Sequence, residues 1–140
     1  MTLQRIRASD VPESAQATWA NAWRLGDEVV MSGMTAHPQM SQAHERGAPL
    51  SVYDETLVVL GKLKALVKAA GGTRHHLVKT VVYVTDIAHK DEVGRARRDF
   101  FGGHYPCSTL VAVSALVFPA LRVEIDAWAR LDVDLRSAQE

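Results

Sequence analysis

The chain has 140 residues, a length that suits one domain with a sizeable core, and we expect a single domain over 1–140. Hydrophobic residues make up 47% of the chain and charged residues 23%, a balance that excludes an intrinsically disordered protein. The 16 basic and 16 acidic side chains cancel, and no basic stripe is visible, which argues against nucleic acid as a partner.

The first fifty residues predict, in order, a weak edge strand over 3–7, a turn over 9–12, a strand over 19–25 and a returning strand over 28–32. The pair Gly26-Asp27 between the last two strands predicts a tight hairpin turn. Residues 34–50 hold two prolines and little periodicity, so we expect a long loop there. Long ordered loops in compact domains are usually functional.

A helix is predicted from Ser51, with Asp54 as its capping-box partner, and apolar residues recur at helical spacing until Gly71-Gly72 ends it. The remaining segments predict a strand over 77–85, a turn over 86–90, a helix over 91–101, strands over 108–115 and 121–130, and a frayed tail from Asp132.

This order predicts an α+β fold, a six-stranded mixed sheet with two helices on one face. A helix is about 10 Å wide and strands lie about 4.8 Å apart, so two helices cover roughly four strands on one face only. Residues 81–84 and 110–113 are nevertheless apolar on both faces of their strands. Because the chain has no further element to cover the second face, we infer a homo-oligomer in which sheets pack face to face.

The chemistry-bearing residues are few, and each has a structural alternative. Glu124 shares a strand face with Arg122 and Asp126, so it either orients a water molecule or forms an ion pair with Arg122. Cys107 is either a nucleophile with His104 as its base or an inert buried residue.

The single cysteine excludes a disulfide within the chain, and neither a signal core nor a membrane-spanning apolar run is present. These features predict a cytoplasmic protein that does not bind a membrane. No HxH, HExxH or CxxC spacing occurs, so we expect no metal and no other cofactor.

Several segments together resemble the RidA/YjgF family of small trimeric proteins. They are residues 24–33, 69–72 and 77–86, the pair Phe100-Phe101 with Pro106, and residues 123–127. Their order and spacing are specific across residues 17–130. The resemblance implies a chorismate-mutase-like protomer, a homotrimer with ligand clefts between subunits, and hydrolysis of reactive enamines or imines to a keto acid and ammonia.

The resemblance also implies site residues, and here the chain departs from the family. Active members carry an arginine two residues after the matching proline that grips the substrate carboxylate; that position is Ser108. A family tyrosine matches Trp19, a family asparagine matches Gly94, and the water-orienting glutamate is retained as Glu124.

The implied cleft has Glu124 as its catalytic residue and is lined by Trp19, Met34, Thr35, Cys107, Ser108 and Thr109. Removing one partner of a buried charge pair costs about 2–5 kcal/mol, so either another cation replaces the missing arginine or the ligand lacks that carboxylate. The candidate cations are Arg24, Arg46 and Arg95. The resemblance therefore predicts an enamine/imine deaminase acting on a diverged small substrate or, alternatively, a non-catalytic small-molecule binder or sensor. A nucleic-acid enzyme is opposed by the neutral charge.

Overall fold

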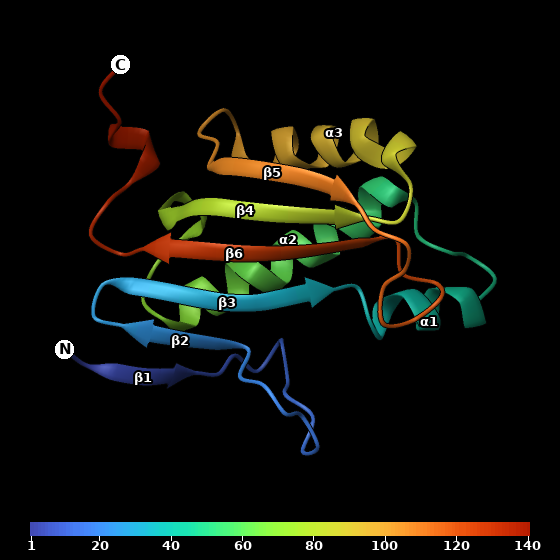
Figure 1. Cartoon of the computed structure of the whole chain (residues 1–140), viewed down its shortest axis with the longest axis horizontal. Coiled ribbons are helices and arrows are strands. Elements are labelled where there is room, and N and C mark those ends of the chain that lie inside the picture. The colour runs from blue at the N-terminus through green and yellow to red at the C-terminus, as the bar shows by residue number, and fades with distance from the viewer.

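Strands with alternating apolar and polar side chains form one six-stranded mixed sheet in the computed structural model, which describes all 140 residues (Figure 1). The strands are β1 (Leu3–Ile6), β2 (Ala22–Leu25), β3 (Glu28–Thr35), β4 (Leu77–Val84), β5 (Cys107–Ala112) and β6 (Val123–Arg130). Their spatial order is β1-β2-β3-β6-β4-β5. The predicted strand over 19–25 is shorter than expected, and Trp19 lies outside it.

The last strand in the sequence lies in the middle of the sheet. β6 pairs antiparallel with both β3 and β4, whereas β4 and β5 run parallel and are joined through a helix. The predicted hairpin between β2 and β3 is confirmed, and Gly26 adopts the left-handed conformation (φ +61°) that its turn requires. All neighbouring strands of the sheet are thus antiparallel except the edge strand β5, which runs parallel to β4.

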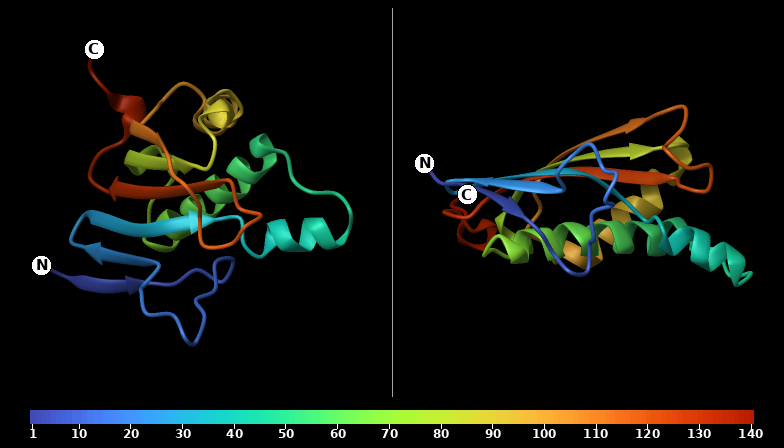
Figure 2. Two further views of the ribbon diagram at one scale, coloured as in Figure 1. Left: turned by 45° about the vertical axis from the view of Figure 1, so that its right-hand side comes forward. Right: turned by 90° about the horizontal axis from the view of Figure 1, so that it is seen from below.

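Two helices, α2 (Val52–Ala69) and α3 (Lys90–Phe101), cover one face of the sheet (Figure 2, right). Ser51 caps α2 as predicted, because its hydroxyl accepts a hydrogen bond from the backbone N–H of Asp54 at 3.0 Å. The core lies between these helices and the sheet. On β6 the side chains facing it, Val123, Ile125 and Ala127 among them, are fully buried.

A third helix corrects the expectation of a structureless loop over 34–50. β3 continues to Thr35, and α1 (Gln39–Glu45) follows at the end of the sheet. Its buried residues, Met40 and Ala43, stand three positions apart on one face. Two buried apolar residues are too few to form a periodic pattern, so this helix could not be predicted from the sequence.

The opposite face of the sheet is not covered by any element of the chain (Figure 2, right). Val81 and Tyr83 on β4 are half-buried there, and Val111 on β5 is 41% exposed. The sequence predicted this exposed face, because two strands are apolar on both sides and the chain has no further element to cover the second side. We refer to this side as the helix-free face.

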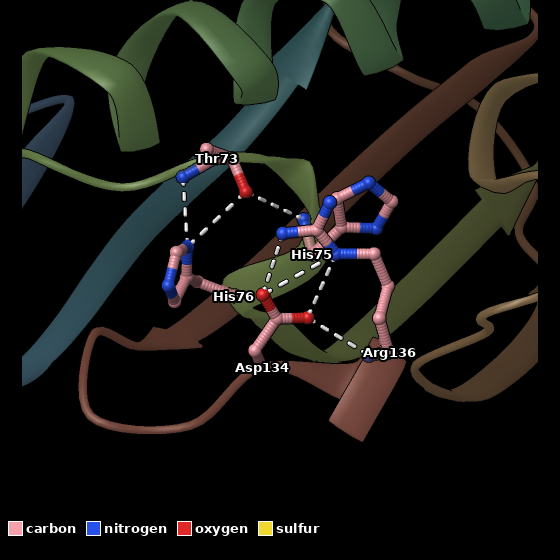
Figure 3. A network of polar contacts seen from close by, with 5 residues as sticks. All are labelled: Thr73, His75, His76, Asp134 and Arg136. Carbon is pink, nitrogen blue, oxygen red and sulfur yellow. Dashed lines mark hydrogen bonds and ion pairs between the residues drawn. The ribbon is translucent and has the colours of Figure 1, made fainter. Parts of the chain in front are cut away.

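The C-terminal tail is docked rather than frayed up to Ser137. Asp134 caps a short 3-10 helix, η3 (Leu135–Ser137), and its carboxylate also pairs with the Arg136 guanidinium at 2.7 Å (Figure 3). That guanidinium holds the pKa of the Asp134 carboxyl well below its usual range. η3 lies against a second 3-10 turn, η1 (Arg74–His76).

In the η1 turn, the hydroxyl of Thr73 accepts a hydrogen bond from the backbone N–H of His75 at 3.2 Å, and His76 Nδ1 accepts one from the backbone N–H of Thr73 at 2.8 Å (Figure 3). The tail therefore rests on a turn that is held by its own side-chain hydrogen bonds. Of the three α-helices, none combines the length and apolar character that a membrane crossing needs.

Candidate active site

Two carboxylates on the central strand β6 point to the helix-free face. Glu124 and Asp126 alternate along β6 with the buried Val123, Ile125 and Ala127, so both side chains project away from the helices. Two carboxylates on one face of a strand are candidates for acid–base chemistry.

The neighbouring strand β3 makes room for these carboxylates with a glycine. Its register against β6 shifts between Met31 and Met34, and Gly33 lies in this irregularity. A Cβ at position 33 would clash with the Glu124 carboxylate and would lie 2.7 Å from Asp126 Oδ1. Only glycine permits this approach of the β3 backbone to the two side chains.

The two carboxylates differ in their partners. Asp126 Oδ2 accepts a hydrogen bond from the Tyr83 hydroxyl at 2.8 Å, and that bond raises the pKa of Tyr83. Glu124 receives no hydrogen bond from the chain. Burial, and then the charge of Asp126, raises the pKa of Glu124 above its ordinary value. A half-buried carboxylate with a raised pKa and free oxygens is suited to accept a proton from water.

The alternative role for Glu124, an ion pair with Arg122, does not occur in the structure. Arg122 instead binds Glu55 on α2, with its Nε donating to Glu55 Oε1 at 2.9 Å. Glu55 is fully buried, and its other oxygen accepts the backbone N–H groups of Arg122 at 2.7 Å and Val123 at 3.1 Å. Glu55 therefore fixes the start of β6 and leaves Glu124 unpaired.

Glu124 borders a cleft of about 660 Å³, which we call the Glu124 cleft. Three of the predicted ligand-binding residues, Trp19, Met34 and Thr35, line it together with Glu124. Trp19 is 56% exposed, so this wall is open to solvent. The other lining residues come from the segment between β1 and β2, from the ends of β3 and α1, from α2, and from the loop before β6.

Lys62 on α2 also lines the Glu124 cleft, and sequence reasoning missed it. Its ammonium donates to the backbone carbonyl oxygens of Thr35 at 2.7 Å and His37 at 2.8 Å, which ties the end of β3 to the helix. Burial lowers the pKa of Lys62. The His37 ring stacks on Phe118, with ring centroids 4.2 Å apart. No local pattern marks Lys62, because its partners lie 25 and 27 residues away.

The other three predicted ligand residues lie elsewhere in the protomer. Cys107, Ser108 and Thr109 belong to β5, which β4 separates from β6. Thr109 faces the helix-free side and accepts a hydrogen bond from Lys79 Nζ at 3.0 Å, whereas Ser108 points toward the helices. Within one copy of the chain, these residues do not meet Glu124.

Cys107 has no base beside it. Its thiol is free and exposed, so the interpretation of a buried, inert cysteine does not hold for the single chain. The His104 ring lies edge-to-face with His75, at 6.0 Å between centroids, rather than against Cys107. The structure thus gives no support for a cysteine–histidine pair.

None of the three candidate cations lines the Glu124 cleft. Arg24 donates to the backbone oxygens of Gly26 at 2.8 Å and Ala70 at 3.0 Å, and so caps the end of α2. Arg95 lies over the Tyr53 ring, 4.4 Å from its centroid, and Arg46 ends α1. The cation closest to Ser108 is a fourth residue, Arg97 on α3.

Comparison with known families and structures shows to which family the chain belongs. The sequence profile of the family described as "Endoribonuclease L-PSP" matches residues 10–131. TdcF of Escherichia coli, named as a candidate reactive intermediate deaminase, is 32% identical over 108 residues, covering 75% of this chain and 80% of TdcF.

Solved structures agree with this assignment. A protein of unknown function from Pseudomonas aeruginosa is 58% identical, with 99% of each chain covered and a TM-score of 0.96. Rv2704 of Mycobacterium tuberculosis, described as a member of the YjgF/YER057c/UK114 family, is 29% identical, with 92% of this chain and 99% of Rv2704 covered and a TM-score of 0.76. TdcF with bound serine is 27% identical, with 91% of this chain and 98% of TdcF covered and a TM-score of 0.78. The chain therefore belongs to the endoribonuclease L-PSP family, the YjgF/RidA family that its sequence resembles.

Proposed function

We propose that this chain is an enamine/imine deaminase that hydrolyses the C=N bond of a small imine in the Glu124 cleft. The observation that carries the proposal is the Glu124 carboxylate itself. It is half-buried, receives no hydrogen bond from the chain, and has a raised pKa beside an open cleft. These are the properties of a base that activates water.

The reaction consumes one water and releases one ammonia. Glu124 accepts a proton from water as the water oxygen adds to the imine carbon, and it returns that proton to the nitrogen, which gives a carbinolamine. The carbinolamine hydroxyl then loses its proton and its nitrogen gains one as the C–N bond breaks, which releases ammonia, leaves a carbonyl group and restores the Glu124 carboxylate. An enamine enters the same route after its tautomerisation to the imine.

The relatives support a small substrate derived from an amino acid. TdcF is named as a candidate reactive intermediate deaminase, and one of its structures holds bound serine. Dehydration of serine yields 2-aminoacrylate, an enamine that tautomerises to the imine of a keto acid. We therefore take 2-aminoacrylate as the first substrate to test.

We further propose that the working cleft lies between subunits of a homotrimer. Assembly through the helix-free face would bring β5 of one copy, with Cys107, Ser108 and Thr109, to the Glu124 cleft of the next. The exposed apolar side chains on that face support this arrangement, Val111 at 41% and Trp23 at 37% among them. Sedimentation equilibrium at micromolar concentration tests it, and a stable monomer would remove the shared cleft.

The deaminase proposal is tested by ammonia release from 2-aminoacrylate generated in place by a serine dehydratase. The parent protein is expected to release ammonia faster than the spontaneous hydrolysis does. Glu124→Gln should lower that acceleration by about 100-fold or more, as loss of a general base does. Glu45→Gln, which changes an exposed glutamate on α1, should retain the parent rate.

Two outcomes would count against the proposal. A parent rate equal to the spontaneous rate would exclude 2-aminoacrylate as substrate. Full activity in Glu124→Gln would exclude Glu124 as the base. Thermal stabilisation of the parent by a keto acid, without turnover of any imine, would instead support the alternative function of a small-molecule binder.

A further inference from the structure

The helix-free face holds a second carboxylate, Asp126, that the proposed reaction does not use. Asp126 follows Glu124 by two residues on β6, so the two side chains are neighbours on the same face of the strand. Asp126 Oδ1 lies 2.7 Å, and Glu124 Cδ 3.0 Å, from the point that a Cβ on residue 33 would occupy. The two carboxylates therefore lie within about 6 Å of each other, the range in which one negative charge opposes the formation of another.

Only one of the two carboxylates is held by a hydrogen bond. In the register of β4 and β6, Tyr83 stands directly opposite Glu124, and Val81 stands opposite Asp126. The Tyr83 hydroxyl nevertheless reaches diagonally along the sheet and donates to Asp126 Oδ2 at 2.8 Å. Asp126 is thus fixed in place, whereas Glu124 accepts no hydrogen bond from the chain.

No cation of the chain forms an ion pair with either carboxylate. Apart from Tyr83, the titratable groups that line the same cleft or stand on the same face of the paired strands are Asp10, His37, Lys62, Lys79 and Arg130. The lysine and arginine side chains among them bond to backbone carbonyl oxygens or to other side chains instead. The charge that acts on Glu124 is therefore that of Asp126. After burial, which is the larger cause, this charge raises the pKa of Glu124.

We propose that Asp126, fixed by Tyr83, is a positioning residue for the deaminase, because its negative charge strengthens Glu124 as the base that takes a proton from water. The inference rests on the proposed function, since it concerns the same base. A carboxylate beside a second negative charge holds a proton more tightly than an isolated one, and a stronger base takes the proton from water more readily. Asp126 does not itself line the Glu124 cleft, so it acts through Glu124 and not on the substrate.

The first test is an NMR titration of the Glu124 carboxyl carbon in the full-length protein, with the signal assigned by its loss in Glu124→Gln. Asp126→Asn keeps the shape of the side chain and an acceptor for Tyr83 but removes the charge, so the Glu124 titration should move to lower pH. Tyr83→Phe releases the Asp126 side chain and should move the Glu124 titration in the same direction by a smaller amount. Asp132→Asn, the same change at an exposed aspartate beyond the end of β6, is the matched control and should leave the titration in place.

The second test is the pH profile of ammonia release from 2-aminoacrylate, with the spontaneous rate subtracted at each pH. Asp126→Asn should move the acid limb of the kcat profile to lower pH, because the weaker base loses its proton at lower pH. At neutral pH kcat should fall by about 10-fold, less than the loss of about 100-fold or more for Glu124→Gln, since a base remains. KM should be unchanged, because Asp126 does not line the cleft.

The possible outcomes separate this role of Asp126 from the deaminase function. Ammonia release by the parent, with the Glu124 titration and the acid limb both unmoved in Asp126→Asn, would overturn the role and leave the deaminase standing. A kcat that falls equally at every pH, with the titration in place, would show a purely structural residue and overturn it as well. A titration that moves in a protein without any ammonia release would confirm the contact between the charges but remove the deaminase and, with it, the catalytic role of Asp126.

Discussion

Replacement of Glu55 by glutamine should destabilise the fold more than most single substitutions. Glu55 is fully buried in α2 and accepts three hydrogen bonds, from the Arg122 Nε and from the backbone N–H groups of Arg122 and Val123. A glutamine of the same shape keeps one oxygen but turns an NH₂ group toward donors. Its neutral side chain also leaves the Arg122 guanidinium without its counter-charge.

The expected loss is about 3–5 kcal/mol, the cost of removing one partner from a buried charge pair. Domains of this size are stable by roughly 5–15 kcal/mol, so a large part of the total would disappear. At about 3 °C per kcal/mol, the melting temperature should fall by roughly 9–15 °C. Because Glu55 fixes Val123, the residue before Glu124, ammonia release should fall as well.

Urea denaturation and calorimetry at one fixed protein concentration measure this effect, since assembly makes apparent stability depend on concentration. Glu45→Gln, on the exposed side of α1, is the control and should stay within about 0.5 kcal/mol of the parent. A Glu55→Gln variant within about 1 kcal/mol of the parent would refute the view that this carboxylate anchors β6 to α2.

Three further predictions follow from the geometry. Gly33→Ala should displace the carboxylates of Glu124 and Asp126, shift the Glu124 titration seen by NMR, and cost about 1–3 kcal/mol of stability; an unchanged titration would contradict the close contact. Glu124→Gln should be more stable than the parent at pH 7, because the folded-state pKa of Glu124 is raised and its ionised form destabilises the fold. This gain in stability should vanish as the pH falls below the ordinary glutamate pKa of about 4.3. Thermal unfolding of variant and parent at both pH values measures it, and a difference in stability that does not change with pH would contradict the prediction. Gly94→Ala should raise the free energy of unfolding by up to about 1 kcal/mol in urea, and a decrease would show an unseen contact at that position.

Local patterns were sufficient to predict most of the fold. The alternation on β6, the Gly26 turn and the Ser51 cap are each determined by neighbouring residues, and all three appear in the structure. The short helix α1 was missed because two buried residues make no periodic pattern. The docking of the tail was missed because it depends on η1, about sixty residues away.

The candidate site was predicted less completely, because its contacts join distant elements. Glu124 was identified from its strand face. It has no ion pair because Arg122 binds Glu55 instead, and 67 residues separate Glu55 from Arg122. Arg97 was not singled out in the sequence, and only the packing of α3 beside β5 brings it to Ser108. Such pairings carry no signal in spacing or composition.

The central place of β6 has a consequence for biosynthesis. Residues 123–130 leave the ribosome last among the strands, yet β3 and β4 both pair with them. A nascent chain halted before this segment holds two half-sheets, each with an open edge and an unfilled side of the core. Productive folding must therefore wait until residues 123–130 have emerged, and truncation products that end before residue 123 should be prone to aggregation and degradation.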